Sequence, residues 1–180
     1  MVARAPPNRP AGRAPALVVR PARLNDVSRL SGFFVEAWRQ TGPGALGFAG
    51  ANDEAIKEIA SEEFLKRRLT TPAIQMMVAE EGGKIIGFSS VRRVDKSHAE
   101  LSGIVVLEHA TGRGVGSRLL RKSLEGARKR GASTLIAKTD AANEGAVRFY
   151  RSAGFTESGK TLGRIGGTKV ELRVMVKKLR

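Results

Sequence analysis

A glycine-rich run stands where an apolar stretch gives way to a helical pattern. The run is Thr111-Gly112-Arg113-Gly114-Val115-Gly116-Ser117. Glycines let the backbone approach a ligand closely, and successive N–H groups can then point into one concavity. The N-terminus of the helix that follows adds a partial positive charge of roughly half a unit. An apolar strand, a glycine turn and a helix in this order predict a phosphate-binding site.

Two other phosphate-binding patterns do not fit these glycines. A P-loop ends in Gly-Lys followed by Ser or Thr, whereas Gly116 is followed by Ser117 and Arg118. The dinucleotide-binding fingerprint that starts at Gly112 would need a glycine at Ser117, and an acidic residue at a strand end about 20 residues later. Both patterns are therefore excluded.

A second constellation follows further along the chain, with Asn143, Ala146, Phe149-Tyr150 and Gly154-Phe155. The glycine run resembles motif A of the GCN5-related N-acetyltransferase (GNAT) family, usually written Arg/Gln-x-x-Gly-x-Gly/Ala, and the second constellation resembles motif B. The segment from Val19 to Leu30 is similar to the first strand and helix of the family, so the resemblance covers about residues 17–179. Thr111 stands where the family has Arg or Gln. This difference affects only one side-chain contact with the ligand, because the glycine turn binds through its backbone.

The resemblance implies that acetyl-CoA binds in a splayed gap between the fourth and fifth strands. The pantetheine arm would pair with backbone groups of the fourth strand, and one of these N–H groups would polarise the thioester oxygen. Asn143 would contact the cofactor, cap a helix, or do both. The implied cofactor-binding residues are Ile104, Val105, Val106, Thr111, Gly112, Arg113, Gly114, Val115, Gly116, Ser117, Asn143 and Tyr150.

Tyr150 is placed by the resemblance as the general acid that protonates the departing thiolate. A phenol of pKa ~10 beside a thiol of pKa ~8.5 can lend a hydrogen bond or a proton in the transition state. The alternative is that Tyr150 only packs a helix face with Ala146.

Glu100 matches the position of the catalytic glutamate in the histone-acetylating branch of the family. Partly buried near the start of a strand, it would act as the base that deprotonates the acceptor. The alternative is an exposed carboxylate at a strand edge. His98 is a second candidate base, although its neighbours predict a hairpin turn, and His109 is expected at the surface.

The implied reaction is direct transfer of the acetyl group to a primary amine in a ternary complex. The chain has no Cys, which excludes a cysteinyl acyl-enzyme. Deprotonation at neutral pH costs about 4.6 kcal/mol for a lysine ammonium and about 1.4 kcal/mol for an α-ammonium. The acceptor stays open, with a protein N-terminus or lysine slightly favoured over a small amine. The resemblance places its site beside residues 42–50, the acidic segment Asp53–Glu63 and residues 163–168.

The net charge of +15 predicts attraction to polyanions. It supports an alternative function, a coenzyme A-type fold that binds RNA or ribosomes with little or no catalysis. The aromatic content of only 5% weakens this alternative, because binding of single-stranded RNA uses base stacking. With no Cys and two His, no metal is expected, and no apolar run approaches the ~20 residues of a membrane helix. A cytoplasmic location is expected, and the sequence leaves a homodimer open.

The chain is expected to form a basic, proline-rich tail that is disordered over residues 1–16, and one N-acetyltransferase domain over residues 17–180. Hydrophobic periodicity predicts the order β-α-α-β-β-β-α-β-α-β-β, with a loop at 41–50, one helix at 53–69 and a hairpin turn at Glu81-Gly82-Gly83. The predicted fold is α/β, a mixed central sheet with helices on both faces, which matches the acyl-CoA N-acyltransferase fold that the resemblance implies.

Overall fold

The structure is a computed structural model that describes residues 15–45, 53–165 and 168–179, so residues 1–14 of the predicted tail lie outside the described residues. The strands are β1 (Val18–Pro21), β2 (Ile74–Glu81), β3 (Lys84–Arg93), β4 (His98–Val106), β5 (Thr134–Asp140), β6 (Thr156–Ile165) and β7 (Thr168–Lys178). The helices are α1 (Val27–Ala45), α2 (Asp53–Ile59), α3 (Glu62–Thr70), α4 (Val115–Lys129) and α5 (Glu144–Ser152), with 3₁₀ turns η1 (Leu24–Asp26) and η2 (Glu108–Ala110).

All of these strands join one sheet in the order β1-β2-β3-β4-β5-β7-β6. The pair β4–β5 is parallel, and the other neighbouring pairs are antiparallel. Helix α4 connects the two parallel strands, as a crossover between parallel strands requires. The predicted mixed α/β sheet is therefore confirmed.

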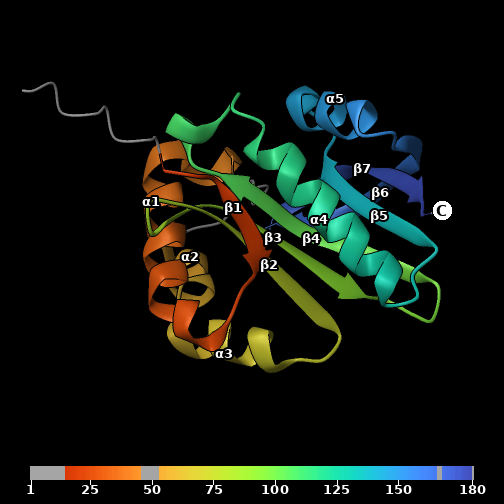
Figure 1. Cartoon of the computed structure of the whole chain (residues 1–180). Helices are drawn as coiled ribbons and strands as arrows, with labels where there is room; N and C mark the ends of the chain where they lie inside the picture. Colours follow the sequence, from red (N-terminus) through yellow and green to blue (C-terminus); the bar gives the residue numbers. More distant parts are fainter. Residues whose placement is uncertain (1–14, 46–52, 166–167, 180) are drawn as a thin grey trace, which may run out of the picture.

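Helices cover both faces of this sheet (Figure 1). Two successive residues of β3 show which helix lies on which face, because side chains alternate along a strand. Gly87 faces α4, where a Cβ atom would lie 2.9 Å from Leu119 Cδ1, whereas the ring of Phe88 packs edge-on against Phe34 of α1 at 5.0 Å. Helix α3 packs beside α1 on the second face, and α5 contributes Val147 to the core that Leu120 of α4 also joins.

The helical region after α1 differs from the sequence prediction. The single helix expected over 53–69 is wrong, because Ser61 ends α2 and starts α3 by accepting a hydrogen bond from the Phe64 N–H at 3.2 Å. The loop expected over 41–50 is wrong in its first half, since α1 runs to Ala45. Residues 46–50 lie outside the described residues.

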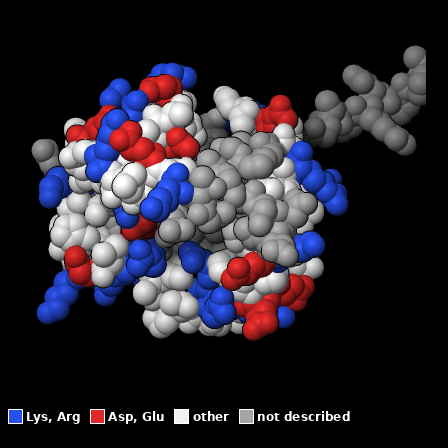
Figure 2. Space-filling view, turned by 180° about the vertical axis from the view of Figure 1, so that it is seen from behind, with Lys and Arg blue, Asp and Glu red and all other residues white. Residues whose placement is uncertain are grey.

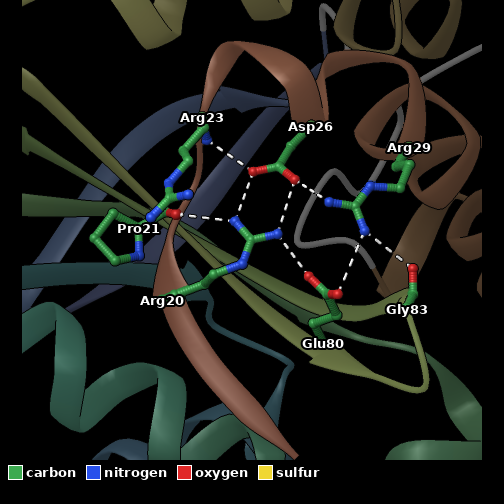
Figure 3. Close-up of polar contacts among 7 residues, drawn as sticks. All are labelled: Arg20, Pro21, Arg23, Asp26, Arg29, Glu80 and Gly83. Atoms are coloured by element: carbon green, nitrogen blue, oxygen red, sulfur yellow. Dashed lines mark hydrogen bonds and ion pairs between the residues drawn. The ribbon is translucent and has the colours of Figure 1, made fainter.

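An ion cluster around the buried carboxylate of Asp26 joins β1, the start of α1 and the end of β2 (Figure 3). Arg20 makes two hydrogen bonds to the carboxylate of Asp26, at 2.7 and 2.8 Å, and a third to Glu80 at 2.5 Å. Asp26, whose side chain is fully buried, also accepts from the Arg23 N–H at 2.8 Å and from Arg29. The bond from the Arg23 N–H also caps the start of η1, and together these bonds lower the pKa of the Asp26 carboxyl far below its ordinary range, chiefly through Arg20.

Within the described residues, no helix is both long and apolar enough to cross a membrane. The same part of the chain contains no cluster of three or more His, Asp or Glu side chains that could hold a metal ion.

Candidate acetyl-CoA site

Strands β4 and β5 separate after a short paired segment. Their pairing covers only His98–Leu101 of β4 and Thr134–Ala137 of β5, although β4 continues to Val106 and β5 to Asp140. Beyond Leu101, the backbone groups of β4 that point away from β3 therefore face a gap instead of a neighbouring strand. Such groups can pair with an extended ligand.

A β-bulge lies in β4 where this gap opens. Ser90 of β3 pairs with Gly103, whereas the next residue, Val91, pairs with Leu101. Ser102 is thus the extra residue of the bulge. A bulge bends its strand and increases the local twist, which explains why β4 turns away from β5 at this point.

The glycine turn lies at the carboxyl end of β4 and leads into α4. Gly112 and Gly114 have φ of 72° and 75°, a left-handed conformation that favours glycine. Gly114 occupies the N-cap position without a side-chain cap, so the first N–H groups of α4, those of Val115, Gly116 and Ser117, have no partner inside the helix. A helix N-terminus of this kind is suited to bind a phosphate.

The gap and the glycine turn together form one cleft of about 610 Å³. Its lining contains most of the predicted cofactor-binding residues, namely Ile104, Val106, Thr111, Gly112, Gly114, Val115, Gly116, Ser117, Asn143 and Tyr150. Residues from both predicted motifs therefore meet in one cavity.

Two predicted cofactor-binding residues do not line the cleft with their side chains. Val105 is buried in the core on the α1 side of the sheet, and Arg113 extends to Glu81, which it meets at 2.6 Å. Side-chain alternation along β4 accounts for Val105. For both residues, a contact with the cofactor would have to use the backbone.

Tyr150 lies deep in the cleft wall and is 6% exposed. Its ring is held between Phe149 and Phe155, with 5.4 Å between ring centroids on each side. Burial raises the pKa of the Tyr150 phenol to about 12, and its hydroxyl makes no hydrogen bond to any other described residue. The hydroxyl is thus neutral at physiological pH and free to donate to a ligand.

Asn143 caps a helix and also lines the cleft, the two alternatives that the sequence left open. Its Oδ1 accepts a hydrogen bond from the Ala146 N–H at 2.9 Å and so caps α5, and the residue also lines the cleft. The cap fixes the start of the helix that carries Tyr150.

Glu100 lies on β4 outside the cleft lining, with 21% of its side chain exposed. Its carboxylate meets Arg92 at 3.3 Å and Lys138 at 3.5 Å. Lys138 itself lines the cleft, so Glu100 is one residue removed from it. The carboxylate is partly buried and ion-paired.

The two histidines lie away from the cleft. His98 Nδ1 meets Asp95 at 2.9 Å within the turn that leads into β4, and His109 is exposed in η2. Neither residue lines the cleft, so the structure does not support His98 as the base.

Residues 30–155 match the Acetyltransferase (GNAT) family. The chain belongs to this family. It is similar to an uncharacterised N-acetyltransferase of Mycobacterium tuberculosis, with 32% identity over 111 residues that cover 62% of this chain and 71% of the relative. It is also similar to the N-alpha-acetyltransferase RimI of the same organism, with 35% identity over 96 residues that cover 52% of this chain and 59% of RimI. Family membership makes the chain an acyltransferase.

Solved structures share the GNAT fold over nearly the whole chain. The ribosomal-protein-alanine N-acetyltransferase of Brucella melitensis has a TM-score of 0.69 at 28% identity, and the likeness covers 90% of this chain and 99% of that one. The PaiA N-acetyltransferase of Thermoplasma acidophilum, solved with coenzyme A, has a TM-score of 0.72 at 22% identity, covering 91% and 99%.

Several residues of this GNAT cleft were missed by the sequence prediction. Ser102 and Gly103 enter the lining through the bulge, and Lys138 and Thr139 enter it from the separated end of β5. A Ser-Gly pair inside an apolar strand is a weak signal of a bulge. Lys138 and Thr139 line the cleft only because β5 separates from β4 after Ala137, and no sequence pattern indicates where two strands separate.

Proposed function

We propose that this GNAT protein transfers the acetyl group of acetyl-CoA directly to a primary amine in a ternary complex. The observation that carries the proposal is the cleft of about 610 Å³, in which the unpaired edge of β4, the glycine turn and Tyr150 meet. A cofactor with a phosphate end and an extended amide-bearing arm fits such a cleft.

The glycine turn would bind the pyrophosphate of acetyl-CoA. Gly112 and Gly114 keep side chains away from this surface, and the N-terminus of α4 presents its N–H groups to it. The amides of the pantetheine arm would pair with backbone groups between Ile104 and Val106. One of these N–H groups would also donate a hydrogen bond to the thioester oxygen as negative charge develops on it.

Tyr150 would stabilise the leaving sulfur mainly as a hydrogen-bond donor. With its pKa raised to about 12, the phenol is a much weaker acid than a thiol of pKa ~8.5, so complete proton transfer to the sulfur is unfavourable by roughly 5 kcal/mol. The proton that the sulfur finally receives would come from the acceptor nitrogen, which loses it on becoming an amide. The C–S bond breaks as the C–N bond forms.

Glu100 is the carboxylate we propose as the base for the acceptor ammonium, acting through a water molecule because it lies outside the cleft lining. The α-ammonium of a peptide N-terminus needs about 3 kcal/mol less for deprotonation than a lysine ammonium. The similarity to RimI, an N-alpha-acetyltransferase by name, also favours an α-amine. We therefore place α-amines, including protein N-termini, ahead of lysine and other small amines.

The test is release of coenzyme A from acetyl-CoA with a panel of amines, followed by mass spectrometry of the products. The panel contains peptides with varied N-termini, peptides with internal lysines, polyamines, amino acids and aminoglycosides. We expect one acetyl group on α-amines, and a decrease of roughly 100-fold in kcat/KM for Glu100→Gln, as expected when a general base is lost. A matched control is Glu157→Gln, which also removes a partly buried, ion-paired carboxylate, here paired with Arg151.

Two outcomes would contradict the proposal. If acetyl-CoA does not bind, the assignment of the glycine turn is wrong. If it binds and no amine is acetylated, the cleft holds coenzyme A for another purpose.

A further inference from the structure

A second pocket, of about 190 Å³, lies on the opposite side of β4 from the acetyl-CoA cleft. The two cavities share Ser102 and Gly103, the residues at the β-bulge. A ligand in the second pocket would therefore reach the place where β4 and β5 separate. The pocket walls are mainly apolar and include Phe34, Phe64, Leu65, Met76 and Phe88.

One charged residue, Arg68 of α3, lines this apolar pocket. Its Nη2 donates a hydrogen bond to Ser90 Oγ at 3.0 Å, and its guanidinium lies 5.6 Å from the centroid of the Phe64 ring. Among the described side chains, no carboxylate forms an ion pair with Arg68. Burial lowers the pKa of Arg68, and the charge of Arg92 lowers it further. A partly buried cation without a counter-ion favours an anionic ligand.

The charges around the pocket add to this preference. Arg92 and Lys138 lie on the neighbouring strands and share the single carboxylate of Glu100. Glu100 is thus engaged by two other cations and does not neutralise Arg68.

The position of Arg68 also limits how far the anion can be from the reacting amine. Ser90, which accepts the hydrogen bond from Arg68, pairs directly with Gly103 across the two strands. The Cα atoms of directly opposed residues in an antiparallel pair lie only about 4.5–5.5 Å apart. An anionic group on Arg68 is therefore close to the shared opening, within the reach of an amine carried by the same small molecule.

We propose that the acceptor is a free α-amino acid with an apolar side chain, its carboxylate on Arg68, its side chain in the pocket and its α-amine at Ser102–Gly103. In a free α-amino acid, one carbon atom separates the amine from the carboxylate, which matches this arrangement. A peptide N-terminus carries an amide at the same place and leaves the charge of Arg68 unpaired. The inference rests on the proposed acetyl transfer and specifies its substrate class.

The experiment compares leucine, leucine amide, 3-methylbutylamine and a peptide with N-terminal leucine as acceptors. Wild type is measured beside Arg68→Gln and the matched control Arg67→Gln, since Arg67 lies on the same helix and against the same Phe64 ring but outside the pocket. We expect wild type to have at least tenfold higher kcat/KM for leucine than for the other three amines. Arg68→Gln should lose this preference for leucine, whereas Arg67→Gln should keep it. The KM for acetyl-CoA should be the same in both variants as in wild type.

Equal or better turnover of leucine amide or the peptide by wild type would overturn the inference and point to protein N-termini. An equal loss with every acceptor in Arg68→Gln would overturn it as well, because it would indicate a structural role.

Binding of the reaction product separates this inference from the proposed function. N-acetylleucine should raise the Tm of wild type and of Arg67→Gln, but not of Arg68→Gln. If N-acetylleucine shows these Tm shifts but no acceptor is acetylated, the proposed acetyl transfer is wrong, whereas the carboxylate-binding site at Arg68 is supported. If N-acetylleucine does not bind to wild type, the carboxylate site fails whatever the activity.

Discussion

At the scale of single residues, the hydroxyl of Tyr150 is a group that the proposed reaction should need. We expect Tyr150→Phe to lower kcat at least tenfold, because the sulfur loses its hydrogen-bond donor, while the KM for acetyl-CoA changes little. Steady-state kinetics with both substrates varied would check this. Unchanged kcat in a folded variant would remove Tyr150 from the mechanism.

The pH dependence follows from the same residue. Because burial raises the pKa of Tyr150 to about 12, the phenol keeps its proton below that pH, and its ionisation should not limit the rate below about pH 11. The same raised pKa affects stability. The contribution of Tyr150 to the free energy of unfolding is complete below its ordinary pKa of about 10 and is lost as pH rises toward 12.

The residues of the site could be predicted from the sequence only where backbone and spacing decide their position. Gly112 and Gly114 were predicted from a local pattern, a glycine turn before a helix, whereas Tyr150 was placed by the family resemblance; all three line the cleft, and their roles stay predictions. Arg68 gave no such signal. In the sequence, Arg68 is the last of three consecutive basic residues near the end of a helix. Only the packing of α3 near Ser90 brings it into a pocket.

At the scale of elements, the turn before α4 should depend on glycine at position 114. Gly114 has φ of 75°, so Gly114→Ala forces an alanine into a left-handed conformation at a cost of about 1–2 kcal/mol. We expect lower stability and a several-fold higher KM for acetyl-CoA, as the N–H groups of the turn shift. The control is Gly32→Ala in α1, where the glycine is exposed and the space around it is open. It should be neutral or stabilising by up to about 1 kcal/mol, and equal loss in both variants would contradict the assignment.

The contact between β1, α1 and β2 should depend on Asp26. Asp26→Asn leaves Arg20 and Arg29 without their shared buried carboxylate, and we expect the free energy of unfolding to fall by about 3–5 kcal/mol in urea titrations. Glu171→Gln, which breaks an exposed pair with Lys160, should cost less than about 1 kcal/mol. Since the pKa of Asp26 is lowered in the folded state, its contribution is complete above the ordinary pKa of about 3.9 and is lost as pH falls. A difference between wild type and Asp26→Asn that does not shrink below pH 4 would contradict this account.

Element prediction succeeded where the signal was local. The hairpin of β2 and β3 was predicted because a Gly-Gly pair between two apolar runs favours a tight turn, and both Gly82 and Gly83 have positive φ in the structure. The prediction of a single helix over 53–69 was wrong. Its acidic start and basic end are typical of one helix dipole, and the sequence analysis did not identify Ser61 as the N-cap of a second helix. The separation of β4 from β5 depends on contacts between segments distant in sequence.

At the scale of the whole molecule, the distribution of charge bears on the RNA-binding alternative, and many cations of the described residues are paired with carboxylates. On the face in Figure 2, Lys and Arg side chains are interspersed with Asp and Glu. The pairs include Arg113 with Glu81 and Arg173 with Glu144. A net charge of +15 attracts anions in general, but on this face the described residues form no continuous basic track for a nucleic acid.

This distribution leads to a prediction about RNA. A fluorescent single-stranded RNA should bind with a Kd no tighter than about 1 µM at 150 mM salt, the range of non-specific binding, and the affinity should fall by orders of magnitude between about 50 and 200 mM. At 200 mM salt, excess RNA should leave coenzyme A release unchanged, because both substrates that we propose are small molecules bound in the cleft and in the pocket behind β4. Nanomolar binding that persists at 200 mM salt would mean that a nucleic acid is a true partner. The charges of the described residues would then be an incomplete description of the surface, and the residues outside the described part of the chain would be the next to test.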